Sequence, residues 1–408
     1  MVLHYLGKNM AKYDSRGFIT ELEPNEVFVF GSNAHGLHTA GAARTAVEKF
    51  GAKMYQGQGL QGQSYAIDTM SGAAEMFMQI KQFLRFAGEH PELTFYVTEI
   101  GCGIAGYDPE YVALGFVKSP KNVILPDSFK KTREKSAQAR HDRKMRLAKI
   151  FADTEKIYDS SMALHDDLQK SIKEAKFYAA EDYPAKPKAG ELPDYEVTSE
   201  RTFESAIRLQ KENPDAKIAV LNFASATSPG GGVLGGSGAQ EESLCRVSTL
   251  YPTLNQDRFW EQYYSYNRRN WDLDSTDACI FTPGVIVFKS DTDYPELMPQ
   301  DEWRKFDVIT CAAPNLRGHR DYSEERQYKV HLRRAKHILS VAAANGDNIL
   351  VLGAFGCGAF LNIPSAVARA FSDAIKDYAG YFDKIVFAIY HRPHEQENYL
   401  TFKEVFGG

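Results

Sequence analysis

Short apolar runs and longer segments with a helical spacing of apolar residues alternate along the chain. The apolar runs have the length of strands and are rich in β-branched residues; they occur at residues 27–30, 94–100, 123–125, 218–223, 285–288, 308–311, 349–352 and 385–389. Several are apolar at consecutive positions, which is typical of strands covered on both faces. We therefore expect a largely buried sheet with helices on both sides.

Three segments between these runs predict amphipathic helices. Residues 73–90 place apolar side chains three and four positions apart, in a single stripe. Residues 323–345 have Ser323 as an N-cap and Gly346 as the stop. Residues 364–378 start with proline, where a missing N–H costs nothing, and are expected to stop at Gly380. Strands that alternate with such helices predict an α/β protein with a mostly parallel or mixed sheet.

The composition is that of an ordinary globular protein. Hydrophobic residues make up 43% and charged residues 25% of the chain, and the net charge of -5 gives no global attraction to nucleic acid or anionic membrane. The start of the chain has no apolar leader segment, and no run of 18 apolar residues occurs. Five scattered cysteines without a CxxC pair argue against a disulfide framework and a zinc knuckle. We expect a cytoplasmic protein with no membrane partner, no metal and no cofactor.

A change in composition near residue 130 predicts a domain boundary. Residues 128–150 contain nine Lys or Arg against two acids, and a charged helical stretch then leads to the proline-bearing residues 183–193. The basic run can be a solvated helix that opens the second domain, or a surface that touches nucleic acid or another polyanion. Because no aromatic residues are interleaved for stacking, the solvated helix is the favoured interpretation.

The most informative segment is residues 230–242. Six of the nine residues from 230 to 238 are glycine, which is too many for the interior of a strand or helix. Successive N–H groups in such a loop can form a nest for phosphate oxygens without a lysine. The segment lacks the GK[ST] of a Walker loop and the GxGxxG that opens a dinucleotide-binding helix. It ends instead in Gln240, Glu241 and Glu242.

An acid pair beside a phosphate-binding loop indicates a substrate with a diphosphate and a bond that must be protonated to break. ADP-ribose or a nucleotide sugar meets that description. Glycosidic cleavage needs an acid for the departing oxygen and a base for the incoming water, and one glutamate can perform both roles in turn. The alternative is that both glutamates face solvent or cap the next helix.

The spacing of GGG, seven residues and QEE resembles the signature of the bacterial-type poly(ADP-ribose) glycohydrolases, which have a macrodomain fold. The resemblance runs from residues 143–148 through 222–226 and 243–246 to 353–360, and so covers most of residues 131–408. It implies that Glu242 is the catalytic acid/base and that Glu241 orients ribose hydroxyls. It also implies that Gly230, Gly231 and Gly232 approach the diphosphate.

Further contacts follow from the same resemblance. The loop after the apolar run 349–352, with Gly356, Cys357 and Gly358, would be a second phosphate loop. Phe360 would stack on the ADP-ribose, or else it is a core aromatic. Asn222, at a strand end, is a candidate for ribose contact, and Gln240 completes the predicted substrate-binding set.

The first 130 residues repeat this arrangement more faintly. One apolar run leads into Gly31, Ser32 and Asn33, and another leads into a second GCG sequence, at residues 101–103. These segments, together with residues 35–38, 41–43 and 59–62, resemble a macro-like domain of phage and bacterial proteins. The sequence departs from that pattern at position 39, which is threonine where glycine is more usual. It also has no acid pair like QEE in this part.

We therefore predict two macrodomain-like, three-layer α/β/α domains with mixed central sheets. Residues 1–130 would form a macro-like domain and possible ADP-ribose reader, with Gly31, Asn33, Gly101 and Gly103 as candidate contacts. Residues 131–408 would form the glycohydrolase-like domain with an N-terminal helical extension.

Other polar residues suggest less specific chemistry. His35 with His38, and His391 with His394, lack a cysteine or carboxylate at ligand spacing, so loop or ribose contacts are favoured over zinc. Ser243 and Cys245 suggest a nucleophile, but no histidine lies close in sequence.

The predicted function is hydrolysis of ribose–ribose linkages, which would remove poly(ADP-ribose) or ADP-ribose from modified protein. Two alternatives stay open. One is an ADP-ribose-binding module without catalysis, and the other is a hydrolase of mono-ADP-ribosylated nucleic acid, with the basic run steering the polymer.

Overall fold

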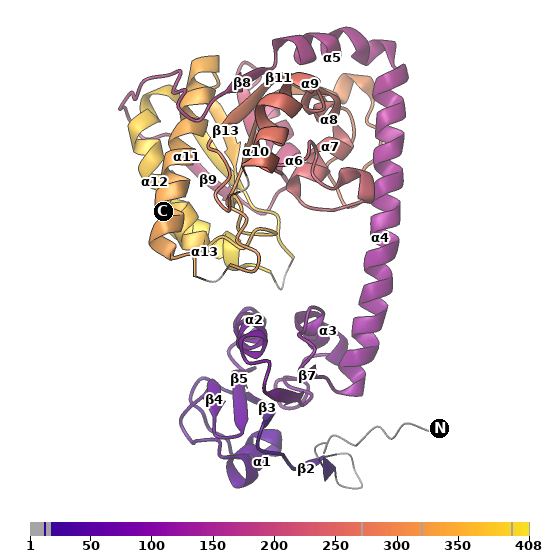
Figure 1. The fold of residues 1–408 in the computed structure, drawn as a ribbon, viewed down its shortest axis with the longest axis vertical. Coiled ribbons are helices and arrows are strands. Elements are labelled where there is room, and N and C mark those ends of the chain that lie inside the picture. Colours follow the sequence, from indigo (N-terminus) through magenta and orange to yellow (C-terminus); the bar gives the residue numbers. More distant parts are fainter. Residues whose placement is uncertain (1–11, 14–17, 271, 320, 393–394, 408) are drawn as a thin grey trace. The chain divides into compact units, whose positions relative to one another are not determined.

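The computed structural model describes residues 12–13, 18–270, 272–319, 321–392 and 395–407. The chain divides into two compact units, Met1–His141 with Arg392–Glu395, and Asp142–His391 with Gln396–Gly408. Each unit has its own sheet and its own apolar cores (Figure 1). The helix α4 (Asp127–Ser160) contains both the division between the units and the boundary predicted at residue 130.

The second unit is built on a seven-stranded mixed sheet of order β8-β11-β12-β10-β13-β14-β9. The strands from β12 to β9 are parallel, whereas β11 pairs antiparallel with both β12 and β8. Their bounds are β8 (Lys176–Tyr178), β9 (Asp194–Thr198), β10 (Ile218–Ala224), β11 (Cys279–Val287), β12 (Arg304–Ala312), β13 (Ile349–Leu352) and β14 (Lys384–Ala388).

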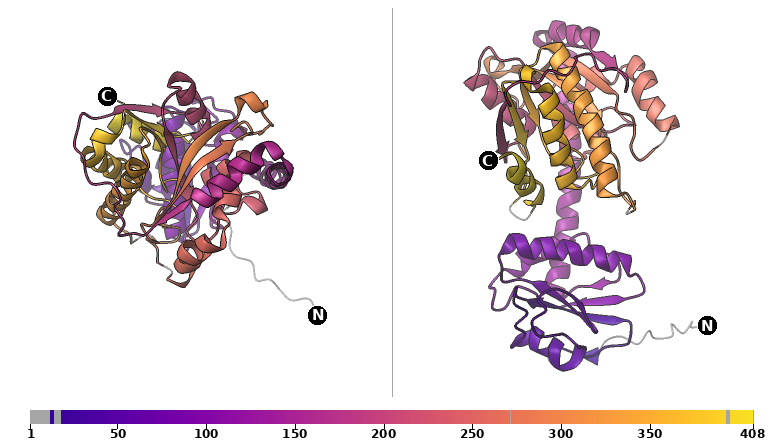
Figure 2. Two further views of the ribbon diagram at one scale, coloured as in Figure 1. Left: turned by 90° about the horizontal axis from the view of Figure 1, so that it is seen from above. Right: turned by 90° about the vertical axis from the view of Figure 1, so that its left-hand side faces the viewer.

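Alternate residues of the central strand β10 enter two different cores, because successive side chains of a strand point to opposite faces. Ala219 and Leu221 join the core under α11 (Glu324–Asn345), α12 (Pro364–Tyr378) and α13 (Glu397–Phe406). Ile218 and Val220 join the core under α6 (Thr202–Glu212), α7 (Gln240–Val247) and α8 (Leu250–Leu254). Figure 2 shows α11 and α12 side by side over one face of the sheet. The predicted α/β/α layering is confirmed.

The first unit has a smaller mixed sheet of order β4-β5-β3-β6-β7. Val27 and Val29 of the central strand join the core under α2 (Ala73–Glu89), and Phe28 and Phe30 join the core under α1 (Gly41–Phe50). The strand bounds are β3 (Glu26–Ser32), β4 (Gly59–Gln61), β5 (Ser64–Asp68), β6 (Thr94–Val97) and β7 (Val123–Ile124), and α3 (Pro109–Ala113) follows β6. The strands β1 (Lys12–Tyr13) and β2 (Ile19–Glu21) pair separately.

The three predicted helices are confirmed as α2, α11 and α12. Ser323 caps α11 by accepting a hydrogen bond from the N–H of Arg326, and Gly346 ends it at φ +79°. The role predicted for Gly380 is wrong, because α12 ends at Tyr378 and Gly380 lies in the 3-10 turn Ala379–Tyr381. A Cβ at Gly380 would lie 3.0 Å from the carbonyl oxygen of Ala189, so this glycine permits a close approach of two backbones.

Several strands differ from the predicted runs. The run at 94–100 ends as a strand at Val97. Thr98 still donates its N–H and its hydroxyl to the carbonyl of Val29, and the chain then turns at Ile100, whose N–H binds the carbonyl of Thr98. The strands β4, β5, β8 and β9 lie outside every predicted run; each has five residues or fewer and carries polar side chains among the apolar ones. No helix within the described ranges is long and apolar enough to cross a bilayer.

A buried acid pair lies where parallel strands of the second unit begin. Asp307 is in the first half of β12, and Asp347 precedes β13 and is 1% exposed. Lys217 Nζ lies 3.0 Å from Asp307 Oδ2 and 4.0 Å from Asp347 Oδ1. Burial, and next the negative charge of Asp307, raise the pKa of Asp347 to about 8.

Asp347→Asn is expected to stabilise the protein most at high pH. Because the pKa of Asp347 is raised in the folded state, folding takes up a proton between about pH 4 and pH 8, and this contribution to stability is lost as the pH rises through that window. Asparagine removes the ionisation, so we expect a Tm gain of about 2–4 °C at pH 9, the shift for about 1 kcal/mol in a unit of this size, and a smaller gain at pH 5. Differential scanning calorimetry at both pH values measures it; a gain independent of pH would contradict the assignment.

Candidate active site

The two glycine-rich loops of the second unit follow neighbouring parallel strands, β10 and β13. The carboxyl ends of parallel strands meet at one edge of a sheet, where ligands of open α/β folds bind. The rings of Phe223, at the end of β10, and Phe355, in the loop after β13, lie 5.6 Å apart. A Cβ on Gly353 would lie 2.9 Å from the Phe223 ring. The structure therefore brings the two loops together.

The acid pair lies in the first turn of α7, and both glutamates are buried. Glu241 Oε2 accepts a 2.7 Å hydrogen bond from the N–H of Ser225, and Glu242 Oε1 accepts a 2.9 Å bond from the N–H of Gly232. Glu242 Oε2 is buried and has no hydrogen-bond partner within the described ranges. The alternative that these side chains face solvent or cap their own helix is therefore wrong.

The environment of Glu241 favours its protonated form. Burial raises the pKa of Glu241 to about 8, and the charge of Glu242 adds to that rise, while the hydrogen bond from Ser225 opposes it. Two adjacent buried carboxylates cannot both ionise cheaply. At neutral pH Glu241 therefore holds a proton.

The glycines before the acid pair leave room for these carboxylates. Gly230 and Gly231 have positive φ, +65° and +57°. A Cβ on Gly231 would lie 2.7 Å from Glu242 Oε1 and 3.0 Å from Glu241 Oε2. A Cβ on Gly230 would lie 2.7 Å from the ring of Tyr251, and one on Gly232 would overlap the hydroxyl of Ser237. A side chain at any of the three positions would displace the loop or the acids.

Asn222 and Gln240 support the acid pair from the sheet. Asn222, on β10, donates to Thr310 Oγ1 at 3.2 Å and lies 3.4 Å from Glu241 Oε1, and its own Oδ1 is buried without a described partner. Gln240 donates both amide N–H groups to the protein, to Thr202 Oγ1 and the carbonyl of Leu221, and it accepts from the N–H of Phe223. In this structure Gln240 fixes the end of β10 rather than offering its N–H groups to a ligand.

Arg246 fixes the far end of the glycine-rich loop. It follows Glu242 by one helical turn, is 2% exposed, and donates to the carbonyl of Ser237 at 2.5 Å. Burial lowers the pKa of Arg246 to about 10, while the charge of Glu242 opposes that change. The sequence placed Arg246 only within the resemblance, because nothing in its spacing distinguishes a buried arginine from an exposed one.

The second loop is fastened by Asn362 and His331, which the sequence did not single out. Asn362 donates to the carbonyls of Pro314 and Gly356, and accepts from His331 Nε2 at 2.9 Å. Burial lowers the pKa of His331 to about 4, so the ring is neutral and carries its proton on Nε2. Gly358 is exposed and Cys357 half-buried.

Phe360, at the end of this loop, is partly a core aromatic, and its predicted stacking on the ligand stays a prediction. It is half-buried against the core under α11 and α12, and the guanidinium carbon of Arg317 lies 5.5 Å from its ring centroid.

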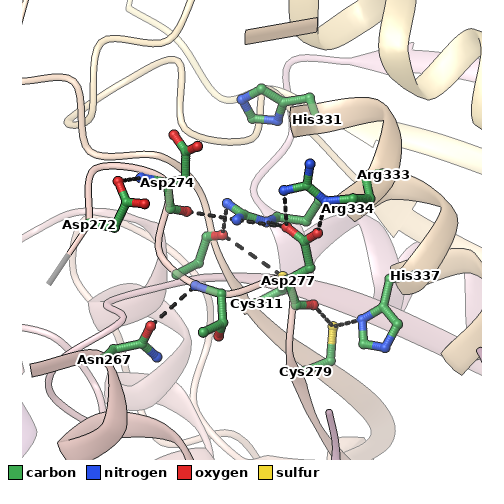
Figure 3. A network of polar contacts seen from close by, with 12 residues as sticks. Asn267, Asp272, Asp274, Asp277, Cys279, Cys311, His331, Arg333, Arg334 and His337 are labelled. Carbon is green, nitrogen blue, oxygen red and sulfur yellow. Dashed lines mark hydrogen bonds and ion pairs between the residues drawn. The ribbon is translucent and has the colours of Figure 1, made fainter. Parts of the chain in front are cut away.

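A buried ionic network joins the loops at this edge (Figure 3). Arg334, on α11, is fully buried and donates to Asp277 Oδ1, to the carbonyl of Ala312 at the end of β12, and to the carbonyl of Asp274. Arg333, half-exposed, binds the same Asp277 carboxylate from outside. The segment that contains Asp274 and Asp277 follows α10 (Ser265–Arg269), whose Arg268 donates to the carbonyl of Thr227 beside the glycine-rich loop.

In the first unit the candidate residues also gather at the carboxyl ends of the strands. A Cβ on Gly31 would lie 3.5 Å from the backbone nitrogen of Gly101, so the ends of β3 and β6 lie close together. Gly103 is exposed with open space around its Cβ position. Asn33 Oδ1 accepts from the N–H groups of His35 and Leu37 and so folds its own turn.

The remaining candidates have structural partners. His38 is buried and lies 2.8 Å from Ser32 Oγ, and His391 packs on the ring of Tyr399. Burial raises the pKa of the fully buried Cys245 thiol. His394 lies outside the described residues, and no group of three potential metal ligands occurs within the described ranges.

Known proteins resemble this chain over the same region. The family described as "Microbial-type PARG, catalytic domain" matches residues 149–290. The structure of poly(ADP-ribose) glycohydrolase (PARG) from Thermomonospora curvata is 32% identical, with a TM-score of 0.58, and the match covers 64% of this chain and 99% of that one. The PARG of Deinococcus radiodurans in complex with ADP-ribose is 35% identical, with a TM-score of 0.52, covering 58% and 96%. None of the curated proteins matches the chain.

An α/β/α fold with a buried acid pair beside a glycine-rich loop defines a class of glycosidase-like macrodomains. The sequence identity to two solved enzymes places the chain in one family of this class. The chain belongs to the microbial-type poly(ADP-ribose) glycohydrolase family. The macro-like interpretation of the first unit stays a prediction.

Arg334→Met is expected to destabilise the second unit by about 3–5 kcal/mol, because it leaves buried polar groups without their charged partner. Arg333→Met is the matched control, since the Arg333 side chain is 53% exposed and shares the same carboxylate; we expect about 0–1 kcal/mol. Urea unfolding followed by tryptophan fluorescence reports on this unit, which contains Trp260 and Trp303. Equal destabilisation of the two variants would contradict the network as described.

Proposed function

We propose that the chain hydrolyses ribose–ribose glycosidic bonds of poly(ADP-ribose), with Glu242 as the acid/base. The observation that carries the proposal is the pair of Glu242 oxygens: Oε1 is held by the N–H of Gly232, and Oε2 is buried and unpartnered within the described ranges. One oxygen is thus fixed by the protein, and the other is available to a substrate. The solved relatives bound to ADP-ribose and to the inhibitor ADP-HPD support this ligand class.

The reaction requires two proton transfers at Glu242, one in each direction. Protonated Glu242 gives its proton to the ribose oxygen of the departing unit as the glycosidic bond breaks. The resulting carboxylate then removes a proton from the water that attacks the anomeric carbon, which restores the acid and leaves two hydroxyl groups. Because Glu241 stays neutral near pH 7, it adds no second negative charge beside the developing carboxylate or the substrate diphosphate.

The other site residues receive roles from their contacts. Glu241 and Asn222 orient ribose hydroxyls, since the Oδ1 of Asn222 is buried without a described partner. Gly230, Gly231 and Gly232 bring backbone close to the diphosphate, as do Gly356, Cys357 and Gly358 on the second loop. Phe360 stacks on the ligand with its exposed part, and Gln240 acts as a positioning residue through the end of β10.

Glu242→Gln is expected to lower the turnover of poly(ADP-ribose) on modified protein by about 10²–10⁴-fold, the usual contribution of a general acid/base, while ADP-ribose binding is retained. Glu261→Gln, an exposed glutamate of the same unit, is the matched control and should keep full turnover. Release of ADP-ribose and calorimetric binding measure the two effects. Unchanged turnover in Glu242→Gln would refute the assignment, and binding without turnover in the unmodified chain would favour a non-catalytic module.

Two arginines in the middle of α4 bear on which acceptor the chain recognises. The Arg143 guanidinium lies against Gly238, since a Cβ on that glycine would be 2.9 Å from its Nη1. Arg146 stacks over Tyr294, with its guanidinium carbon 4.3 Å from the ring centroid. Arg143 therefore borders the glycine-rich loop. Arg146, three residues further along the same helix, adds a second cation beside an aromatic ring from another element. This arrangement supports steering of a phosphate-bearing polymer, on protein or on nucleic acid.

Replacing Arg143 and Arg146 by Gln is expected to weaken the salt dependence of kcat/KM on both poly(ADP-ribosyl)ated protein and ADP-ribosylated DNA. The slope against log salt should fall by about 0.7 for every phosphate that the variant no longer neutralises, the value for single strands. Lys130→Gln with Lys131→Gln, exposed on the first turn of the same helix, is the control and should leave the slope unchanged. A slope equal to that of the parent chain would argue against steering.

A further inference from the structure

The two sheets share one topology. In chain order, the strands β3 to β7 occupy the same places in the first sheet as β10 to β14 in the second, giving β4-β5-β3-β6-β7 and β11-β12-β10-β13-β14. The pairings also agree: the central strand is parallel to both neighbours, and the strand after it in the chain is antiparallel at the same position. The register is also shared. The first residue of β3, Glu26, pairs with the first residue of β6, Thr94, and the first residue of β10, Ile218, pairs with the first residue of β13, Ile349. The strands β3 and β10 have the same length.

The loops after β6 and β13 are the same structure. Their hydrogen bonds correspond one for one, at residue numbers that differ by 255 throughout. In the first unit the backbone bonds are Ile100 N to Thr98 O, Cys102 N to Glu99 O, Gly106 N to Gly103 O and Tyr107 N to Gly101 O. In the second unit the corresponding bonds, in the same order, are Phe355 N to Gly353 O, Cys357 N to Ala354 O, Leu361 N to Gly358 O and Asn362 N to Gly356 O.

Side-chain and backbone details repeat as well. Cys102 and Cys357 each donate their thiol to the carbonyl two residues earlier. Gly101 and Gly356 have φ values of +73° and +78°. The helices that follow begin with Pro109 and Pro364. Such agreement extends beyond the GCG sequence that the loops have in common.

Both loops present backbone donors that the protein does not use. The N–H groups of Gly103, Ile104 and Ala105 make no hydrogen bond to any described part of the chain, and neither do those of their counterparts Gly358, Ala359 and Phe360. A Cβ on Gly103 or on Gly358 would meet nothing within 4 Å. Successive unpaired N–H groups over open space form a nest for phosphate oxygens.

At the described positions that correspond to the acid pair and its partners, the first unit has different side chains. Phe30 stands on β3 where Asn222 stands on β10, and Ala66 stands on β5 where Thr310 stands on β12. The first turn of α1, after β3, contains no acid, whereas the first turn of α7 holds the glutamate pair. The shared loop is therefore kept without the catalytic side chains.

We infer that the first unit carries a second binding site for a nucleoside diphosphate sugar of the ADP-ribose class, at residues 101–106, which binds this ligand without hydrolysing it. The ligand class rests on the proposed function of the second unit, because it is taken from the loop's counterpart there. The full chain would then hold one unit of a polymer while it cleaves another, or retain the product.

The test is calorimetric titration of ADP-ribose into the full chain, with poly(ADP-ribose) turnover measured on the same samples. We expect two sites per chain. Gly103→Leu, which fits the open space above the loop, should leave one site with turnover unchanged; Gly358→Leu should also leave one site, with turnover abolished. Lys49→Leu, at an exposed position on the last turn of α1, places the same leucine side chain elsewhere in the first unit and should leave two sites.

A second pair of variants changes an exposed side chain of the loop. Ile104 is 85% exposed, and Ile104→Glu and Ile104→Lys differ from each other mainly in the sign of their charge. We expect Ile104→Glu to weaken the second site at least tenfold and Ile104→Lys to leave it as tight or tighter. One site in the parent chain, abolished by Gly358→Leu, would overturn the inference, and so would an affinity that is insensitive to both Ile104 variants. A chain that binds at the Ile104-dependent site but has no turnover would overturn the proposed function instead.

Discussion

The burial of two adjacent glutamates at the end of a parallel strand is the constraint on which the active site depends. Glu241 and Glu242 can occupy this place only because backbone N–H groups of Ser225 and Gly232 meet their oxygens. These N–H groups are available because the chain after β10 is an irregular loop. The missing side chain at Gly231 gives the carboxylates their space. Burial then keeps Glu241 protonated, so that the pair carries fewer charges than its sequence suggests.

Other buried side chains of the second unit fix the helix and the loops around the acid pair. Gln240 fastens α7 to the end of β10, and Arg246 fastens the end of the glycine-rich loop. Arg334 links the segment after α10 to the end of β12, and Asn362 with His331 fastens the loop after β13. These groups are buried and polar, and each of them donates a hydrogen bond to an oxygen of another segment of the chain. Replacing one of these side chains therefore frees the loops that it holds.

The two units are variations on one strand arrangement. The loops after β6 and β13 have the same hydrogen bonds, including one donated by a cysteine thiol. The loops after β3 and β10 differ. The loop after β10 is rich in glycine and is followed by the acids, and the loop after β3 leads into an α1 without acids in its first turn. A fold can thus keep its phosphate-binding geometry while catalytic residues occur in only one copy.

The sequence by itself determined the class of fold, the helices α2, α11 and α12, and the segment that carries the chemistry. Those features depend on local patterns: apolar periodicity, caps, and a glycine-rich run beside an acid pair. It also indicated a repeat, through the GCG sequences at 101–103 and 356–358. It could not place the short strands β4, β5, β8 and β9, because each gains its stability from partners distant in the chain.

Only the tertiary structure decided which polar residues belong to the site. Four separate segments supply its buried polar residues: Thr310 on β12, Arg246 on α7, His331 and Arg334 on α11, and Asn362 after β13. Nothing in the sequence spacing of these residues marks them as members of one site. The protonation of Glu241 and the role of Gln240 also depend on neighbours brought in from other strands. The faint repeat became an equivalence of strands, register and hydrogen bonds for the same reason: backbone geometry persists where side chains have changed, and a sequence records only the side chains.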